Sequence, residues 1–388
     1  MKNIFSSMTA VLAAALIALP ACNTVDTPSK VVDVKGDLAV KVHVPSGAAT
    51  KAESADITAV DGDLSISSLQ VLAYNYADGK LSRDLGRKTA SITSPYVIST
   101  PDGAGLPADN STTGKRYAAV ALVNYADQSA VMNYSGDNGV LGSTAAAGMN
   151  LDLKNIFLSQ TRSNGILRIG KNDGVYVKPN ITNQAAVTAD IPAFRAVLRS
   201  VEVDLYDKTA TLDVKGIMLI NVMSKWNLGM AGSPSTFINL AGRKSGASAS
   251  TSADDFIKAE SDIPADYRYL TWKTVSGISY SGTAVTNNQL SAAVYGLPNA
   301  TSTDSFTGPI PANGSAYTRA VLVATYNGEY CYYPVSINAP TYGKTYDIKM
   351  KIRNKGSVDP NDEPKYGALA VTVTVNSWTS GGVFNPEF

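Results

Sequence analysis

Histidine and cysteine are almost absent from this chain, which holds one histidine and two cysteines among 388 residues. It has no HExxH motif, no spacing of His and Cys typical of metal ligands, and no glycine-rich phosphate loop after a strand. The one histidine, His43, lies on the polar side of an alternating stretch, and no Ser-His-Asp or Cys-His arrangement can be built around it. The sequence therefore predicts no enzyme, no bound metal and no cofactor.

Charge is scarce as well. Asp, Glu, Lys and Arg make up 17% of the chain, and the formal net charge is +1. Proteins that bind nucleic acid or an anionic membrane surface usually carry a basic excess, so neither is expected as a partner. Tyrosine is abundant, with 20 residues against 8 phenylalanines. This composition is typical of half-buried strands and tight turns.

Long apolar runs are missing except near the N-terminus. Lys2 precedes an Ala- and Leu-rich run over residues 8–19, which is too short for a comfortable membrane-spanning helix. It predicts a signal peptide over residues 1–21. The next residue, Cys22, follows a small residue as in a bacterial lipobox, so the sequence predicts that Cys22 is lipidated. The alternative interpretation is an ordinary signal peptide with an incidental cysteine.

Alternation of apolar and polar residues recurs along the chain. Residues 346–352 and 369–375 are the best alternating runs near the C-terminus. An earlier run places four apolar side chains on one face: Leu38, Val40, Val42 and Val44. Asn172-Asp173-Gly174 and Asn327-Gly328 each predict a hairpin turn. Helical patterns are few, so the sequence predicts an all-β fold.

The length suits two domains. We expect two tandem β-sandwiches of transthyretin-like, Greek-key type. The expected order is a signal peptide (1–21), a lipidated propeptide that includes the first strand (22–51), an N-terminal sandwich (52–187), a C-terminal sandwich (188–378) and a C-terminal tail (379–388).

In the order of its sequence motifs, the chain resembles the Bacteroidales fimbrillins, the major fimbrial subunits of type V pili, over nearly its whole length. The lipobox and first strand are followed by Ala48-Ala49-Thr50-Lys51-Ala52, where fimbrillin precursors carry a basic cleavage site. The C-terminal pieces are Tyr332-Tyr333-Pro334-Val335, then Gly343-Lys344-Thr345-Tyr346-Asp347, then residues 369–375 and Trp378. The chain departs from the best-known fimbrillins at Lys51, since those are cut after arginine.

The resemblance implies a lipid-anchored precursor at the outer membrane and a protease that cuts between Lys51 and Ala52. The first strand would then leave, and the C-terminal segment of another copy, or of a related fimbrial subunit, would fill its place. Repetition of this head-to-tail contact would build an adhesive cell-surface fimbria.

The C-terminal tail is predicted to be the inserted strand. The tail 379–388 has a Gly381-Gly382 hinge followed by apolar Val383, Phe384 and Phe388. The alternative is the valine-rich run at 369–375. Two further functions stay open: a tip or anchor subunit of the same fimbria, and a surface lipoprotein that binds glycans.

Overall fold

The structure is a computed structural model of the 388-residue chain. It describes residues 34–45, 65–90, 92, 95–125, 150–157, 165–227, 237–244, 252–298, 317–337, 339–362 and 367–377. These belong to one compact unit, Val34–Phe388. Cys22, Lys51, Ala52 and the tail 379–388 lie outside the described residues, as does the expected signal peptide.

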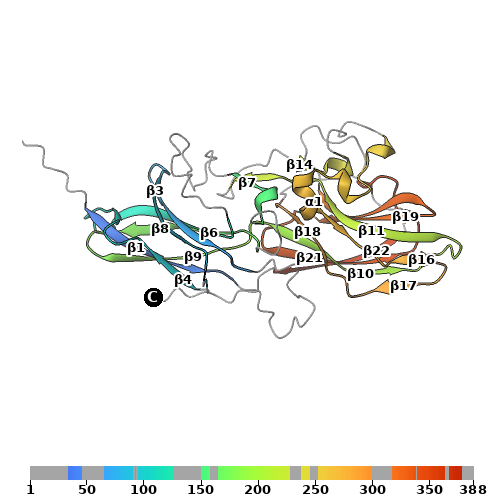
Figure 1. Ribbon diagram of the computed structural model, residues 1–388, viewed down its shortest axis with the longest axis horizontal. Coiled ribbons are helices and arrows are strands. Elements are labelled where there is room, and N and C mark those ends of the chain that lie inside the picture. Colours follow the sequence, from blue (N-terminus) through green and yellow to red (C-terminus); the bar gives the residue numbers. More distant parts are fainter. Residues whose placement is uncertain are drawn as a thin grey trace, which may run out of the picture. The chain divides into compact units, whose positions relative to one another are not determined.

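The N-terminal part of this unit forms two sheets (Figure 1). Both sheets contribute side chains to one apolar cluster. One sheet has the order β4-β1-β5, and β9 also pairs with β1. Its strands are β1 (Lys35–His43), β4 (Tyr96–Ser99), β5 (Leu106–Pro107) and β9 (Thr182–Thr188). The other sheet has the order β3-β2-β6-β8. Its strands are β2 (Leu69–Asn75), β3 (Leu81–Lys88), β6 (Lys115–Val123) and β8 (Arg168–Val177).

The C-terminal part contains two five-stranded sheets. The first has the order β17-β10-β21-β22, and β18 also pairs with β10. Its strands are β10 (Phe194–Val203), β17 (Val285–Asn287), β18 (Ala292–Gly296), β21 (Lys344–Ile352) and β22 (Leu369–Ser377). The second has the order β15-β11-β19-β20, and β16 also pairs with β11. Its strands are β11 (Thr211–Ile220), β15 (Trp272–Thr274), β16 (Ser279–Ser281), β19 (Thr318–Tyr326) and β20 (Glu329–Ile337).

Short elements complete the fold. Two small sheets pair β12 (Val222–Met223) with β14 (Phe237–Ile238), and β13 (Lys225–Asn227) with β7 (Asn150–Asp152). The helix α1 (Ala265–Thr271) is the only α-helix among the described residues; the 3-10 turns are Leu153–Asn155, Leu240–Gly242, Ala253–Asp255 and Glu260–Asp262. Strands dominate throughout, so the all-β expectation is confirmed.

The largest apolar cluster extends beyond the C-terminal sheets. It includes Leu72 from β2 and Val120 from β6, whereas the neighbouring Val71 and Ala121 belong to the N-terminal cluster. Because alternate residues of a strand face opposite sides of a sheet, β2 and β6 bury both faces. This explains why the sequence of β6 is almost continuously apolar. The division between sandwiches at residues 187 and 188 stays a prediction.

The two hairpin predictions have different outcomes. Asn327 and Gly328 both have positive φ and join β19 to β20 as a two-residue turn, as expected. The hairpin predicted at Asn172-Asp173-Gly174 is wrong, because these residues lie inside β8. There the register against β6 shifts, and the Asn172 side chain accepts the N–H of Gly174 at 2.9 Å. The Asn-x-Gly pattern thus makes a β-bulge instead of a turn.

Candidate functional site

The strand β1 lies in the middle of its sheet. It pairs in parallel with β9, from Asp37 opposite Thr182 to His43 opposite Thr188. On its other side it pairs antiparallel with β4, through four residues that include Lys41 opposite Val97. We call the place of residues 37–45 between β4 and β9 the β1 slot. A chain without β1 would have two facing strand edges with unpaired N–H and C=O groups.

The inward face of β1 is fully buried. Leu38, Val40 and Val42 are 0% exposed and Val44 is 1% exposed. They pack in the N-terminal cluster with residues of the facing sheet such as Val71. At about 1.5–3 kcal/mol per buried apolar side chain, removal of the four would cost about 6–12 kcal/mol. An empty slot therefore strongly favours a substitute strand.

Side chains from both sheets bind the backbone near the two ends of β1. Near its start, the amide of Asn183 donates to the carbonyl of Asp37 at 2.9 Å, and the hydroxyl of Thr100 accepts the N–H of Leu38 at 3.2 Å. At its other end, the buried guanidinium of Arg168 donates to the carbonyl of Pro45. These three contacts are with main-chain atoms, and the Thr100 hydroxyl also donates to the carboxylate of Asp37 at 3.2 Å.

Charged groups gather beside the last residues of β1. Burial raises the pKa of Asp190, and the charges of Arg168 and His43 oppose that rise. Burial lowers the pKa of His43, against the charge of Asp190. His43 is therefore half-buried next to a carboxylate, whereas the sequence placed it on a solvated strand face.

The C-terminal strand β22 lies at the edge of its sheet. Among the described residues it pairs only with β21, in an unbroken register of nine pairs. The N–H of Arg353 donates to the carbonyl of Ala368 at 3.0 Å, so these two residues form a hydrogen-bonded pair. From there, non-hydrogen-bonded and hydrogen-bonded pairs alternate along the two antiparallel strands. By that alternation the main-chain groups of Val371, Val373 and Val375 point away from β21, toward the open edge.

The three valines of β22 are exposed although they face the core side. They lie opposite the buried Met350, Ile348 and Tyr346 of β21, and side chains of directly opposed residues share one face of a sheet. The exposed fractions are 37% for Val371, 37% for Val373 and 54% for Val375. A stripe of apolar side chains at an open strand edge is a surface that readily takes up another strand or sheet.

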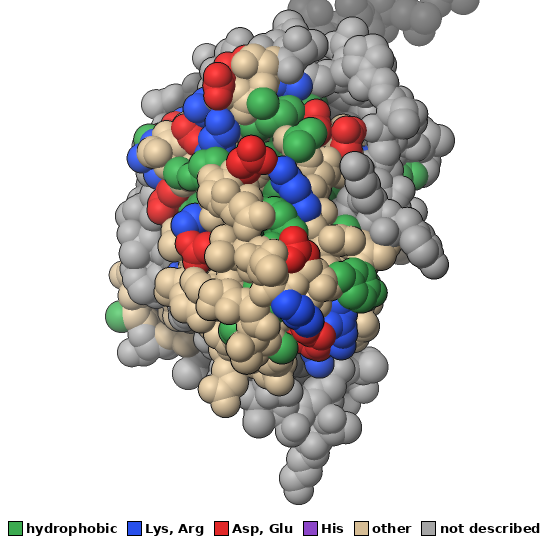
Figure 2. All heavy atoms as spheres, turned by 90° about the vertical axis from the view of Figure 1, so that its right-hand side faces the viewer, with side chains coloured by type: hydrophobic (Ala, Val, Ile, Leu, Met, Phe, Trp, Pro, Cys, Tyr) green, Lys and Arg blue, Asp and Glu red, His purple; other side chains and the backbone are tan. Residues whose placement is uncertain are grey.

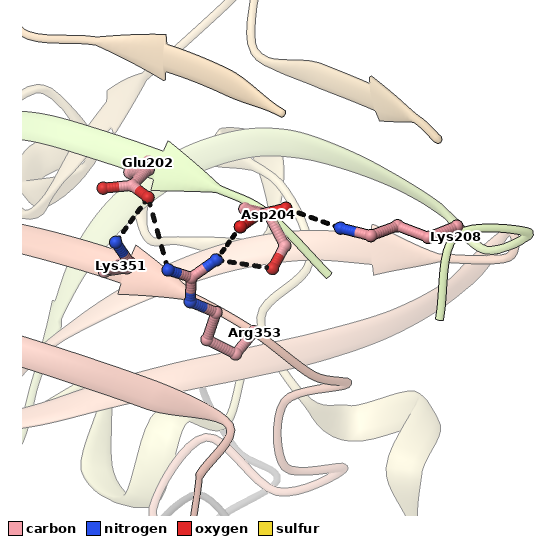
Figure 3. Close-up of polar contacts among 5 residues, drawn as sticks. All are labelled: Glu202, Asp204, Lys208, Lys351 and Arg353. Carbon is pink, nitrogen blue, oxygen red and sulfur yellow. Dashed lines mark hydrogen bonds and ion pairs between the residues drawn. The ribbon is translucent and has the colours of Figure 1, made fainter. Parts of the chain in front are cut away.

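The neighbouring strand β21 is held independently of β22. An ion-pair network links its end to β10: Lys351 lies 2.6 Å from Glu202, and Arg353 contacts both Glu202 and Asp204 (Figure 3). Hydrogen bonds from Lys208 and Arg353 lower the pKa of Asp204. Each partly exposed pair contributes little alone, but together they tie β21 to β10 on the side away from β22.

The strands β1 and β22 carry nearly the same sequence. Residues 37–45 read Asp-Leu-Ala-Val-Lys-Val-His-Val-Pro, and residues 368–376 read Ala-Leu-Ala-Val-Thr-Val-Thr-Val-Asn. All four inward residues of β1 recur in β22, as Leu369, Val371, Val373 and Val375. Both runs stand out in the sequence as alternating strands, but only the structure reveals that one is buried and the other exposed.

This arrangement has counterparts among solved structures. A proposed cell adhesion protein from Bacteroides eggerthii has a TM-score of 0.57 at 15% identity, with 89% of this chain and 96% of that chain covered. A fimbrilin from Porphyromonas gingivalis has a TM-score of 0.51 at 12% identity, with 91% and 100% covered. The chain has the fimbrillin fold. A proposed cell adhesion protein from Parabacteroides distasonis is also similar, with a TM-score of 0.52 at 13% identity and 91% and 99% covered.

Sequence comparison adds nothing to this structural likeness. No protein-family model matches the chain, and no curated protein matches it. At these identities the neighbours establish the fimbrillin fold alone. The expectation drawn from the order of the sequence motifs and the independent match of the fold therefore agree on the same group of proteins.

Apart from the two strands, an open cleft of about 600 Å³ lies in the C-terminal part of the described residues. It is lined by Lys215, Lys258, Glu260, Arg268, Trp272 and Tyr330, among others. No group of three His, Cys, Asp or Glu suited to a metal ion occurs among the described residues. No helix in the same residues is long and apolar enough to cross a membrane.

The end of the C-terminal part has a mixed surface. On the face drawn in Figure 2, acidic, basic and apolar side chains are interspersed, and no patch of a single charge spreads across it. That face therefore does not have the basic stripe by which proteins usually hold nucleic acid.

Proposed function

We propose that this protein is a fimbrial subunit that polymerises head-to-tail by strand exchange into a cell-surface adhesive fimbria. One observation carries the proposal: the central strand β1, whose inward face is fully buried, and the exposed edge strand β22 share the inward residues Leu, Val, Val and Val. The partners are other copies of the chain and related fimbrial subunits. The fold shared with a fimbrilin agrees with this role.

In this proposal β1 occupies the slot in the precursor until proteolysis releases it. The β22 segment of the next subunit then enters, so that its exposed valines become buried as Val40, Val42 and Val44 are now. Donor and acceptor are different surfaces of the same chain, so the contact repeats without closing on itself. The ion pairs between β10 and β21 support a home sheet that keeps its other strands when β22 departs.

The precursor is proposed to be held at the outer membrane by a lipid on Cys22. Replacement of Cys22 by alanine removes the thiol that would carry the lipid. We therefore expect a Cys22→Ala precursor that keeps its signal peptide and takes up no labelled palmitate, as measured by metabolic labelling of cells. Continued palmitate labelling of that variant would show that Cys22 is not the lipid site.

Cleavage between Lys51 and Ala52 is proposed to start assembly. A trypsin-like protease needs the cation at Lys51, so we expect Lys51→Gln to accumulate as a folded precursor and to form no fibres. Immunoblots and electron microscopy of cell-surface material measure this, with Lys51→Arg as the control that retains cleavage. Normal fibres made from Lys51→Gln would refute the site.

The tail 379–388 is the second candidate for the inserted strand. A deletion of residues 383–388 removes Val383, Phe384 and Phe388 but leaves β22 complete. If β22 fills the slot, this deletion still yields oligomer ladders on an unheated gel. If the tail fills it, the truncated protein is cleaved normally but stays monomeric. The match between β22 and β1 favours the first outcome.

The cleft in the C-terminal part favours glycan binding as a second candidate function. Tyr330 is 37% exposed, and Lys258 lies over its ring at 5.7 Å. Aromatic faces combined with charged groups suit a saccharide, and this cleft has the size of a ligand site. Titration with acidic and neutral oligosaccharides, compared between wild type and Tyr330→Ala, tests the idea. Equal binding by both proteins would exclude the cleft.

A further inference from the structure

The residue before β22 is held firmly in the C-terminal part. Ala368 is 0% exposed, and its carbonyl accepts the N–H of Arg353 at 3.0 Å. The N–H of Tyr206 in turn donates to the carbonyl of Arg353 at 2.9 Å. Three main chains therefore lie side by side at the end of the sheet where β22 begins. Strand exchange requires only β22 itself to leave, so Ala368 can keep its place.

The slot begins beside an exposed residue of the N-terminal part. The N–H of Asp37 donates to the carbonyl of Ile181 at 3.2 Å, and the next residue, Leu38, belongs to the apolar cluster. When the four inward residues of the two strands are matched, Leu369 takes the place of Leu38. Consecutive Cα atoms are about 3.8 Å apart. Ala368 then lies where Asp37 lies now, next to Ile181 of the receiving subunit.

Ala368 thus brings one end of each part together. Neighbouring main chains in a sheet are spaced by about 4.8 Å. Two such steps lead from Tyr206 through Arg353 to Ala368, and one more leads to Ile181 of the receiving subunit. The Cα atoms of Tyr206 and Ile181 would therefore be about 15 Å apart or less, and side chains of this size can meet across that distance.

Both positions carry apolar side chains that are strongly exposed in the single subunit. Among the described residues, Tyr206 is the most exposed large apolar residue of the C-terminal part, at 68%. Ile181 is the most exposed one of the N-terminal part, at 51%. Single exposed apolar residues are common on protein surfaces. Here, however, each lies at the end of its part where strand exchange would join two subunits.

We propose that Tyr206 of one subunit packs against Ile181 of the next, as a second contact beside the inserted strand. This inference rests on the proposed strand exchange and deepens it. The partner of each side chain is another copy of the chain, because the short connection at Ala368 holds the two ends together. Burial of the two side chains would stabilise each junction in the fibre.

A looser junction is the alternative. Asn361 is a firm attachment further upstream, since its side-chain oxygen accepts hydrogen bonds from Arg319 at 2.8 Å and Asn221 at 3.1 Å. If Ala368 also left its place, the chain from Asn361 to Leu369 could span up to about 29 Å. The two ends would then have no fixed contact. The burial of Ala368 favours the short connection.

Photo-cross-linking tests the contact in assembled fibres. Full-length chains carry p-benzoylphenylalanine in place of Tyr206, or in place of Tyr342 as the matched control, and are cleaved and assembled. Both tyrosines are exposed, at 68% and 47%. They lie at opposite ends of one sheet, because Tyr206 follows β10 and Tyr342 precedes β21, which runs parallel to β10.

After irradiation, we expect the Tyr206 variant to give linked pairs that survive heating, with the adduct mapped by mass spectrometry to the peptide that contains Ile181. The Tyr342 variant should give no adduct there. Fibres in which Tyr206 links elsewhere, or in which Tyr342 links to this peptide, would overturn the contact and leave strand exchange intact. If wild-type chains form no polymer after cleavage, strand exchange fails and the contact fails with it.

A pair of charge substitutions tests the same contact without a cross-linker. Ile181→Asp should still polymerise, because Ile181 belongs to neither apolar cluster, but its oligomer ladder should separate at a lower temperature than that of wild type. Tyr206→Lys should behave likewise. The double variant should regain thermal resistance, since opposite charges then face each other across the junction. Strictly additive losses would show that the two side chains do not meet.

Discussion

Replacement of Val371, Val373 and Val375 together by lysine is expected to abolish polymerisation and leave a folded, cleavable subunit. In the free subunit these side chains are 37–54% exposed, so lysine there costs little. In the slot they would occupy the fully buried positions of Val40, Val42 and Val44, where an unpaired charge is very unfavourable. Unheated gels and electron microscopy should therefore find monomers only.

The matched control uses the other face of the same strand. Thr372 corresponds to Lys41 of β1, so lysine at Thr372 should be tolerated in the slot. We expect fibres from this control. Fibres from the triple valine variant, or their loss in the threonine variant alone, would contradict the assignment of β22 as the inserted strand.

The Val42→Asp substitution is expected to have the largest effect on the stability of the precursor. Val42 is 0% exposed and lies in the N-terminal cluster, and a carboxylate there has no partner in an apolar environment. We expect a loss of more than about 4 kcal/mol in the free energy of unfolding, which is exceptional for one substitution. Chemical denaturation of the purified precursor measures it.

Its control is Lys41→Asp, one residue earlier on the outward face. Surface substitutions of this kind usually change stability by less than about 0.5 kcal/mol. If Val42→Asp is no less stable than Lys41→Asp, β1 does not contribute to the core as its burial indicates. Removal of β1 would then not favour the binding of another strand in its place.

Local patterns in the sequence were enough to predict the strands themselves. Alternation identified residues 38–44 and 369–375, because the period of two follows from strand geometry. The turn at Asn327-Gly328 was predictable because both residues tolerate positive φ. In each case the deciding interactions lie within a few residues of each other.

The partners of these strands were not predictable in the same way. The parallel pairing of β1 with β9 joins residues far apart in the chain, and nothing in either strand encodes the other. The bulge at Asn172 was mistaken for a turn because the same Asn-x-Gly hydrogen bond serves both structures. The hydrogen bonds from Asn183, Thr100 and Arg168 to the backbone near β1 were not predictable either, since these residues look like ordinary polar surface residues until the fold buries them.

The central claim is that β1 leaves the subunit and a C-terminal strand of the next copy takes its place. Mass spectrometry of fibres purified from the cell surface tests this most directly. The account predicts that subunits in the fibre begin at Ala52 and that no peptide from residues 37–45 is recovered. Fibres whose subunits retain Leu38, Val40, Val42 and Val44 would contradict it.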